Sequence, residues 1–296
     1  MRIDVENMSK VMIIAAVNGP TTKRQNPNVP LQPDEIIRAA CDCCNAGASI
    51  LHVHPKGPDG LPTGDLSIFS RILQGVRAKC DIPVQYGNDL GMFAASDGAR
   101  RNASYDERLS ILDIDPPMDI STINSGSFSA GGRDFLNPHE FNVRYVEKAS
   151  SKGIPILCQT YDVSHIANNL QLRDEGALPD PVRFSFVTGN PGGIEAHPKN
   201  LMHMIDMVPE GSIWELVAKQ NHFPMVMAAL ALGGHIRVGF EDNVFAFPGE
   251  LAKSNAQLVE KAVRMVRDAG REVASIDDAR RFWGLAKPKS PGSSKR

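Results

Sequence analysis

Short apolar runs recur along this chain at intervals of roughly thirty to forty residues, and each is followed by a stretch with helical periodicity. The runs are rich in Val and Ile and are bounded by Gly, Pro and Asn, which is typical of buried strands. We expect strands at residues 11–17, 49–54, 82–86, 118–124, 154–159, 182–188, 212–218 and 235–240. We expect the intervening helices to begin near Gln32, Asp65, Ser104, Pro138, Asp162, Pro198, Asn221 and Gly249.

Strands that alternate with helices predict a parallel sheet, because parallel neighbours need a crossover helix between them. Eight such units in a chain of 296 residues predict a single-domain α/β protein with a (β/α)8 TIM barrel over residues 11–286. The alternative is an open doubly wound sheet, but its glycine-rich dinucleotide motif is absent after the first strand. Residues 1–10 are expected to form an N-terminal extension, and residues 287–296 a disordered tail rich in Pro, Ser, Gly and Lys.

Composition narrows the class of protein. The net charge of −2 argues against a nucleic-acid partner, and no apolar segment approaches the length that spans a membrane. The first ten residues lack the apolar region of a signal peptide, and the five cysteines are an odd number. Together these features predict a cytoplasmic protein with no membrane partner.

The expected second strand ends in His52 and His54, whose side chains point to the same face because they lie two residues apart. By themselves these histidines are either a metal-binding pair or two satisfied polar residues. Glu241 follows the expected eighth strand, and barrel closure leaves only one strand between the two ends. Two histidines and one carboxylate with an open position are typical of catalytic zinc, although Mn²⁺, Co²⁺ and Fe²⁺ also accept this set.

Two charged residues flank Glu241. Asp242 is either a general base at the mouth of the site or an ordinary loop residue. Arg237 stands four residues before Glu241, about 13 Å away in a straight strand, so we expect it deeper in the barrel. There it either orients a catalytic carboxylate or forms a structural ion pair. Polar, glycine-rich loops after other expected strands favour a substrate with several oxygen atoms; they lie at 18–22, 87–89, 122–127 and 188–193.

Several stretches resemble one known family, the β-keto acid cleavage enzymes, which include the 3-keto-5-aminohexanoate cleavage enzyme. The resemblance runs from about Met12 to Leu285. The matching stretches are Gly47-Ala-Ser-Ile-Leu-His-Val-His54, Phe186-Val-Thr-Gly-Asn-Pro-Gly-Gly193, Pro198-Lys-Asn-Leu-Met202, Gly233-Gly-His-Ile-Arg-Val-Gly-Phe-Glu-Asp-Asn243 and Ser254-Asn-Ala-Gln-Leu-Val259.

The resemblance implies a zinc-dependent acyltransferase that converts a β-keto acid and acetyl-CoA into a new acyl-CoA and acetoacetate. It implies that His52, His54 and Glu241 hold one Zn²⁺ and that Asp242, oriented by Arg237, transfers the proton. The metal would chelate the keto and carboxylate oxygens of the substrate. By analogy with the family, the chain is expected to form a homo-oligomer, with a tetramer as the assembly.

The chain also departs from the aminohexanoate-cleaving members. Their rim glutamate, which pairs with the substrate's amino group, falls on Thr21, and their Ser-Thr pair falls on Gly87 and Asn88. Thr122 matches a substrate contact of the family, and Asn124 lies in the same rim loop. We therefore expect a β-keto acid other than 3-keto-5-aminohexanoate, because a buried ammonium facing Thr21 would lose a charge-assisted hydrogen bond.

Two other enzyme classes use similar sites. A metal-dependent hydrolase usually needs further histidines at later strand ends, where this chain has Gln159 and Thr188. A metal-dependent aldolase would split a C–C bond without CoA. The sequence does not locate the CoA phosphates, because Arg24, Lys56 and Lys199 are as typical of solvated surface as of phosphate contacts.

Overall fold

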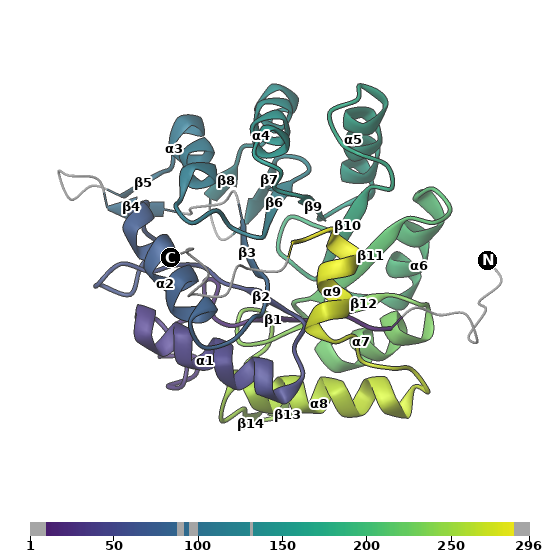
Figure 1. The fold of residues 1–296 in the computed structure, drawn as a ribbon. Helices are drawn as coiled ribbons and strands as arrows, with labels where there is room; N and C mark the ends of the chain where they lie inside the picture. Colours follow the sequence, from purple (N-terminus) through teal and green to yellow (C-terminus); the bar gives the residue numbers. More distant parts are fainter. Residues whose placement is uncertain (1–9, 88–91, 95–99, 131–132, 287–296) are drawn as a thin grey trace, which may run out of the picture.

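The computed structural model describes residues 10–87, 92–94, 100–130 and 133–286, and shows a closed barrel of parallel strands surrounded by helices (Figure 1). Within these ranges eight strands close in the order β1-β12-β11-β10-β9-β6-β3-β2. Their bounds are β1 Ile13–Ala16, β2 Ile50–His52, β3 Val84–Gly87, β6 Ile120–Asn124, β9 Ile156–Thr160, β10 Arg183–Thr188, β11 Ile213–Ala218 and β12 His235–Val238. The predicted TIM barrel is confirmed.

Helices follow the strands and cover the outside of the barrel (Figure 1). They are α1 Pro33–Ala46, α2 Leu66–Arg77, α3 Tyr105–Ser110, α4 His139–Ser151, α5 Val163–Asp174, α6 Pro198–Met207, α7 His222–Ala231 and α8 Asn255–Asp268. All but α8 begin within one residue of the expected position. Helix α8 begins later than Gly249 because a hairpin of β13 (Phe245–Phe247) and β14 (Glu250–Leu251) comes first, and Ser254 caps the helix.

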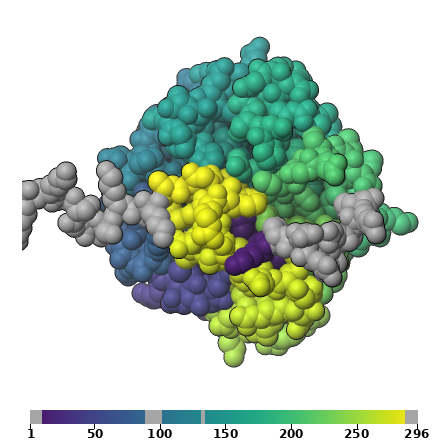
Figure 2. All heavy atoms as spheres, turned by 45° about the vertical axis from the view of Figure 1, so that its right-hand side comes forward, coloured from purple at the N-terminus to yellow at the C-terminus, as the bar shows by residue number. Residues whose placement is uncertain are grey.

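The N-terminal end of the barrel is closed by α9 (Ile276–Trp283), which the sequence did not predict. Figure 2 shows this helix in yellow beside the purple start of β1. Ala279 and Trp283 join a buried cluster with inward-facing residues of the strands, namely Met12, Ile14, Ile50, Ile120 and Leu157. The guanidinium of Arg183 lies 4.8 Å from the centre of the Trp283 ring.

The opposite end of the barrel carries the longer connections. Besides β13 and β14, two hairpins form there, β4 (Met92–Ala94) with β5 (Arg100–Asn102) and β7 (Phe128–Ala130) with β8 (Arg133–Phe135). They follow β3 and β6, and the sequence did not predict them. The expected tail at 287–296 and all of the expected extension except Lys10 lie outside the described residues. Among the described helices, none combines the length and apolar character that a membrane span requires.

Candidate metal and catalytic site

His52, His54 and Glu241 meet at the C-terminal end of the barrel. His52 is the last residue of β2, and Glu241 follows β12. The two imidazole Nε2 atoms lie 3.1 Å apart, and Glu241 Oε2 lies 3.5 Å from His52 Nε2 and 3.6 Å from His54 Nε2. Among the described residues, these three form the one group of at least three His, Cys, Asp or Glu side chains close enough to share a metal ion.

The spacing of these atoms fits a small divalent cation. Ligand atoms about 2.0–2.1 Å from a tetrahedral Zn²⁺ lie roughly 3.3 Å from one another, close to the separations of 3.1, 3.5 and 3.6 Å seen here. Glu241 Oε2 is buried and has no hydrogen-bond partner in the part of the chain that the structure describes. A carboxylate oxygen that faces two imidazole nitrogens without a donor is poorly satisfied unless a cation lies between them. The donor set therefore fits a metal such as zinc.

Gln85 orients the first of the two histidines. It lies opposite His52 in the pairing of β2 with β3, and its Oε1 is 2.7 Å from His52 Nδ1. This contact assigns the ring proton to Nδ1, so Nε2 turns its lone pair toward Glu241. Burial lowers the pKa of His52 to about 3, with Glu241 opposing and Arg237 adding to the shift. The imidazole is therefore neutral at physiological pH, as a metal ligand must be.

Two glycines allow Glu241 to reach the histidines. Strand β12 ends at Val238, and Gly239 turns the chain with a φ of 138°. The Glu241 amide then donates to the Ala16 carbonyl at 3.1 Å. On the neighbouring loop, a Cβ at Gly19 would lie 2.1 Å from Glu241 Cγ, so this position has room only for glycine.

The same turn explains the contacts of Arg237. Its side chain is buried in the barrel, as expected, and is 2% exposed. A straight strand would have carried Glu241 away from Arg237, but the chain turns after Val238, so Arg237 Nη2 lies 2.8 Å from Glu241 Oε1. Arg237 therefore pairs directly with the proposed metal ligand.

Asp242 is held by two cations. Arg237 donates from Nε to Oδ2 at 2.8 Å and from Nη2 to Oδ1 at 2.7 Å, and Lys219 Nζ lies 2.5 Å from Oδ1. Burial raises the pKa of Asp242, but Arg237 and Lys219 outweigh it and hold the pKa below its usual range. Asp242 is therefore ionised at neutral pH. Its side chain has no exposed surface, whereas that of Lys219 is 19% exposed.

Sequence reasoning missed Lys219 and Gln85. Lys219 directly follows β11, so a polar residue at a strand end was its only signal. Gln85 lies inside β3, where it looks like one polar residue in an apolar strand. Their importance depends on which strands become neighbours. The strand order of the barrel places β11 beside β12 and β3 beside β2.

A cavity of about 660 Å³ opens over these residues. Thr21, Gly87 and Thr122 line it; that they contact substrate stays a prediction. Thr21 Oγ1 donates to the Phe240 carbonyl at 2.7 Å. Asn124 is not among the lining residues; its Oδ1 accepts from the Tyr161 hydroxyl at 3.3 Å. Asn88 lies outside the described residues.

The three basic residues without an assigned role fall into two groups. Lys56 is buried and lines the cavity, so of the two alternatives left open by the sequence, solvated surface does not apply to it. Its backbone forms an isolated antiparallel bridge with Pro62. Arg24 and Lys199 are exposed.

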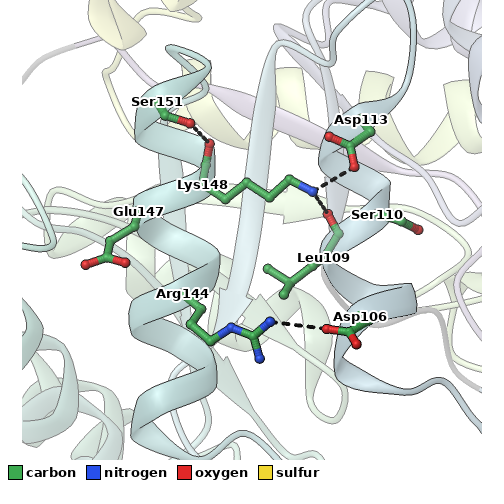
Figure 3. A pocket seen from close by; sticks show the side chains of 8 residues that line it. All are labelled: Asp106, Leu109, Ser110, Asp113, Arg144, Glu147, Lys148 and Ser151. Carbon is green, nitrogen blue, oxygen red and sulfur yellow. Dashed lines mark hydrogen bonds and ion pairs between the residues drawn. The ribbon is translucent and has the colours of Figure 1, made fainter.

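A second hollow, of about 630 Å³, lies on the outside between α3 and α4 (Figure 3). Two pairs of its charged side chains face each other across the groove. Arg144 is 3.2 Å from Asp106, and Lys148 is 2.7 Å from Asp113. These exposed ion pairs are typical of surface helices, and we assign no site to them.

Comparison with known proteins gives one family. A family model described as beta-keto acid cleavage enzyme matches residues 10–285. The 3-keto-5-aminohexanoate cleavage enzyme of Acetoanaerobium sticklandii is 35% identical over 95% of this chain and 100% of its own length. The 3,5-dioxohexanoate:acetyl-CoA acetone transferase of Paraburkholderia graminis is 28% identical over 93% of this chain and 96% of its own length.

A solved structure of ObcA in its apo form superimposes with a TM-score of 0.74. The match covers 88% of this chain and 66% of that chain, at 15% sequence identity. The superposition supports the barrel fold. At an identity this low, it carries no argument about the reaction.

Proposed function

The chain belongs to the beta-keto acid cleavage enzyme family, and from that premise we propose that it exchanges acyl groups between a β-keto acid and acetyl-CoA. The balanced reaction is R–CO–CH2–COO⁻ plus CH3–CO–SCoA, giving R–CO–SCoA plus CH3–CO–CH2–COO⁻. The observation that carries the proposal is the contact between the His52, His54 and Glu241 group and the Arg237–Asp242 pair. A metal held by these three side chains would lie beside an ionised carboxylate.

His52, His54 and Glu241 would hold one divalent metal, with zinc as the first choice. When bound, the metal polarises the keto group of the substrate and lowers the barrier to removing a proton from the adjacent carbon. Burial raises the pKa of Glu241, but Arg237 and the two histidines hold it well below its usual range. The carboxylate is thus ready to bind a cation across the physiological pH range.

Asp242 is the proposed base that removes the proton from C2 of the keto acid. Arg237 fixes the carboxylate from one side, and Oδ2 accepts only the bond from Arg237 Nε among the described residues. The Lys219 ammonium lies over Oδ1, and the side chain of Asp242 is fully covered. We therefore expect Lys219 to move aside when substrate binds, so that C2 can approach the carboxylate.

The remaining steps conserve atoms and protons. The C2 carbanion attacks the acetyl carbon of acetyl-CoA and releases the CoA thiolate. The thiolate adds to the original keto carbon, and cleavage of the C2–C3 bond releases the new acyl-CoA. The acetoacetate carbanion then takes back the proton that Asp242 has held.

The substrate is proposed to be a β-keto acid other than 3-keto-5-aminohexanoate. Thr21, whose hydroxyl is occupied by the Phe240 carbonyl, offers no charge to an amino group. Two further properties stay predictions. Sedimentation of the purified protein tests whether it forms a homo-oligomer, with a tetramer expected, and cell fractionation tests whether it is cytoplasmic.

The decisive experiment measures acetoacetate formation by the zinc-loaded protein from β-keto acids, with and without acetyl-CoA. Asp242→Asn is expected to lower kcat by about 10²- to 10⁴-fold while retaining the metal, because the base is lost and the ligands remain. Asp113→Asn, on the outer surface, is the matched control. Turnover without acetyl-CoA would favour an aldolase instead, and an unaltered Asp242→Asn rate would remove Asp242 from the mechanism.

A further inference from the structure

The two halves of the cavity wall differ in charge. The charged lining residues come from β2, β11 and β12 and from the loops that follow them, which lie together on one side of the closed barrel. The described lining residues that follow β6, β9 and β10, on the other side, are all uncharged. The side of the cavity that faces the proposed metal ligands is therefore uncharged in its described lining.

Aromatic rings dominate the uncharged side. Phe128 stacks on Phe135 with ring centres 5.0 Å apart and on Tyr161 with ring centres 4.1 Å apart. Phe128 and Phe135 come from the hairpin of β7 and β8, and Tyr161 follows β9. All three line the cavity, together with Ala130 and Val187. We call these five residues the aromatic wall.

The described residues of the hairpin, which carry Phe128, Ala130 and Phe135 of this wall, contact the segments around them. A Cβ at Gly192, in the loop after β10, would lie 1.9 Å from the Ser129 carbonyl oxygen, so the loop and the hairpin are in direct contact. Ser127 Oγ accepts from the Asn137 amide at 2.8 Å and closes the base of the hairpin. These contacts support the part of the wall that the hairpin carries, against which a ligand can pack.

We propose that this wall binds the tail of the substrate, and that the enzyme selects β-keto acids whose tail is uncharged and apolar. The inference rests on the proposed function, in which the keto and carboxylate oxygens lie at the His52, His54 and Glu241 site. A β-keto acid anchored by both oxygen groups directs its remaining carbons away from that site. The opposite side of the cavity is the aromatic wall.

A charged tail would lack a partner there. In the described lining, the carboxylates are those of Glu241 and Asp242, and both already pair with Arg237. An ammonium group placed against the wall would lose water without gaining an ion pair, which is unfavourable. A carboxylate in the same place would lose water in the same way. Apolar carbons, in contrast, gain contact with the rings.

Three six-carbon acids provide the test, because they share a backbone and differ in the charge of the tail. They are 3-oxohexanoate, which is neutral at the tail, 3-keto-5-aminohexanoate, which is cationic, and 3-oxoadipate, which is anionic. Calorimetric titration into the zinc-loaded protein without acetyl-CoA gives Kd, and acetoacetate formation with acetyl-CoA gives kcat/KM. We expect 3-oxohexanoate to bind at least tenfold more tightly than either charged acid.

Two variants locate the selection at the wall. Phe128→Ala is expected to weaken binding of 3-oxohexanoate about tenfold and to leave the KM for acetyl-CoA unchanged. Ala130→Asp places a carboxylate on the wall and is expected to reverse the preference toward 3-keto-5-aminohexanoate. Phe247→Ala, an exposed aromatic outside the cavity lining, is the matched control. Unfolding curves confirm that each variant is folded, and Phe128→Leu replaces Phe128→Ala if the latter is not.

The outcomes separate this inference from the proposed reaction. Selective binding of the neutral acid without turnover would overturn the reaction and keep the inference. Equal or tighter binding of the cationic acid would overturn the inference, because the rings would then bind the ammonium by cation–π contacts. The inference is also overturned if the anionic acid binds as tightly as the neutral one, if none of the acids binds, or if Phe128→Ala changes only the KM for acetyl-CoA.

Discussion

At the N-terminal end of the barrel, the inward side chains of β2, β6 and β9 are apolar and pack against α9. Two residues further along the same strands, the inward side chains are polar and line the cavity. The pairs are Ile50 and His52, Ile120 and Thr122, and Leu157 and Gln159. The same strands thus form an apolar end and a polar end of the barrel. The two ends are separated by two residues, the spacing of side chains on one face of a strand.

The difference teaches where stability and function lie. The apolar end removes Trp283 and its neighbours from water, which favours folding. The polar end buries Arg237 and Asp242, whose desolvation must be offset by their mutual hydrogen bonds. We therefore expect changes at the polar end to reduce function with little loss of stability, and changes at the apolar end to do the reverse.

The largest effect is expected from Glu241→Ala. Removing one of three proposed ligands should abolish tight metal binding and lower kcat/KM by on the order of 10³-fold or more. The free energy of unfolding of the metal-free protein should change by less than about 1 kcal/mol, because Arg237 keeps Asp242 as a partner.

Elemental analysis, the acetoacetate assay and urea unfolding measure these three quantities. Glu210→Ala, an exposed position, is the control. A Glu241→Ala protein that keeps its metal and its rate would show that the site has been placed wrongly.

Trp283→Ala is expected to produce the opposite result. The variant leaves a cavity among Met12, Ile14 and Ala279, and should lower the free energy of unfolding by about 3–5 kcal/mol. Below its melting temperature, kcat/KM should equal that of the unaltered protein. Met202→Ala, at a half-exposed position, should leave both quantities unchanged. A large loss of kcat/KM in the folded Trp283→Ala protein would contradict the separation of the two ends.

Gln85→Ala should have a smaller effect within the polar end. Without the Oε1 acceptor, His52 is free to rotate and to change tautomer, so metal affinity should fall about 10- to 100-fold. Competition with a chelator of known affinity measures this change. Gln85→Glu keeps an acceptor at the same distance and should retain most of the affinity. If Gln85→Ala bound metal as tightly as the unaltered protein, the orienting role would be disproved.

The smallest effect is expected on the pH dependence of stability. It comes from His235, which lies near the apolar end. Burial, together with Arg271, lowers the pKa of His235 to about 3, while His235 Nδ1 accepts from the Met12 amide. The unfolded chain therefore takes up a proton below about pH 6.5 that the folded protein does not. Stability from this group is complete above that pH and falls as pH decreases toward 3, by on the order of 1 kcal/mol per pH unit.

His235→Gln keeps an acceptor for the Met12 amide and cannot take up the proton. Its unfolding free energy should therefore depend less on pH between 6.5 and 5 than that of the unaltered protein, as urea unfolding at several pH values will show. Equal slopes for the two proteins would mean that His235 does not contribute to acid destabilisation.

The barrel was predictable because its strands are buried on both faces and therefore read as continuous apolar runs. The hairpins after β3, β6 and β12 were not predictable, since they are short and lie within long connections. Helix α9 was missed because only Ala279, Arg280 and Trp283 of its eight residues are buried, so it resembles a solvated segment. In these cases tertiary contacts, more than local pattern, stabilise the element.

The sequence by itself determined the fold, the family and the ligand side chains at the end of β2 and after β12, because apolar periodicity and residue type are local properties. Only the tertiary structure decided that Arg237 folds back onto Glu241, that Lys219 covers Asp242 and that Gln85 orients His52. It also decided that Phe128, Phe135 and Tyr161 gather opposite the ligands. The strand order of the barrel brings Lys219 to Asp242 and Gln85 to His52, which lie 23 and 33 positions apart, and the turn at Gly239 brings Glu241 back to Arg237.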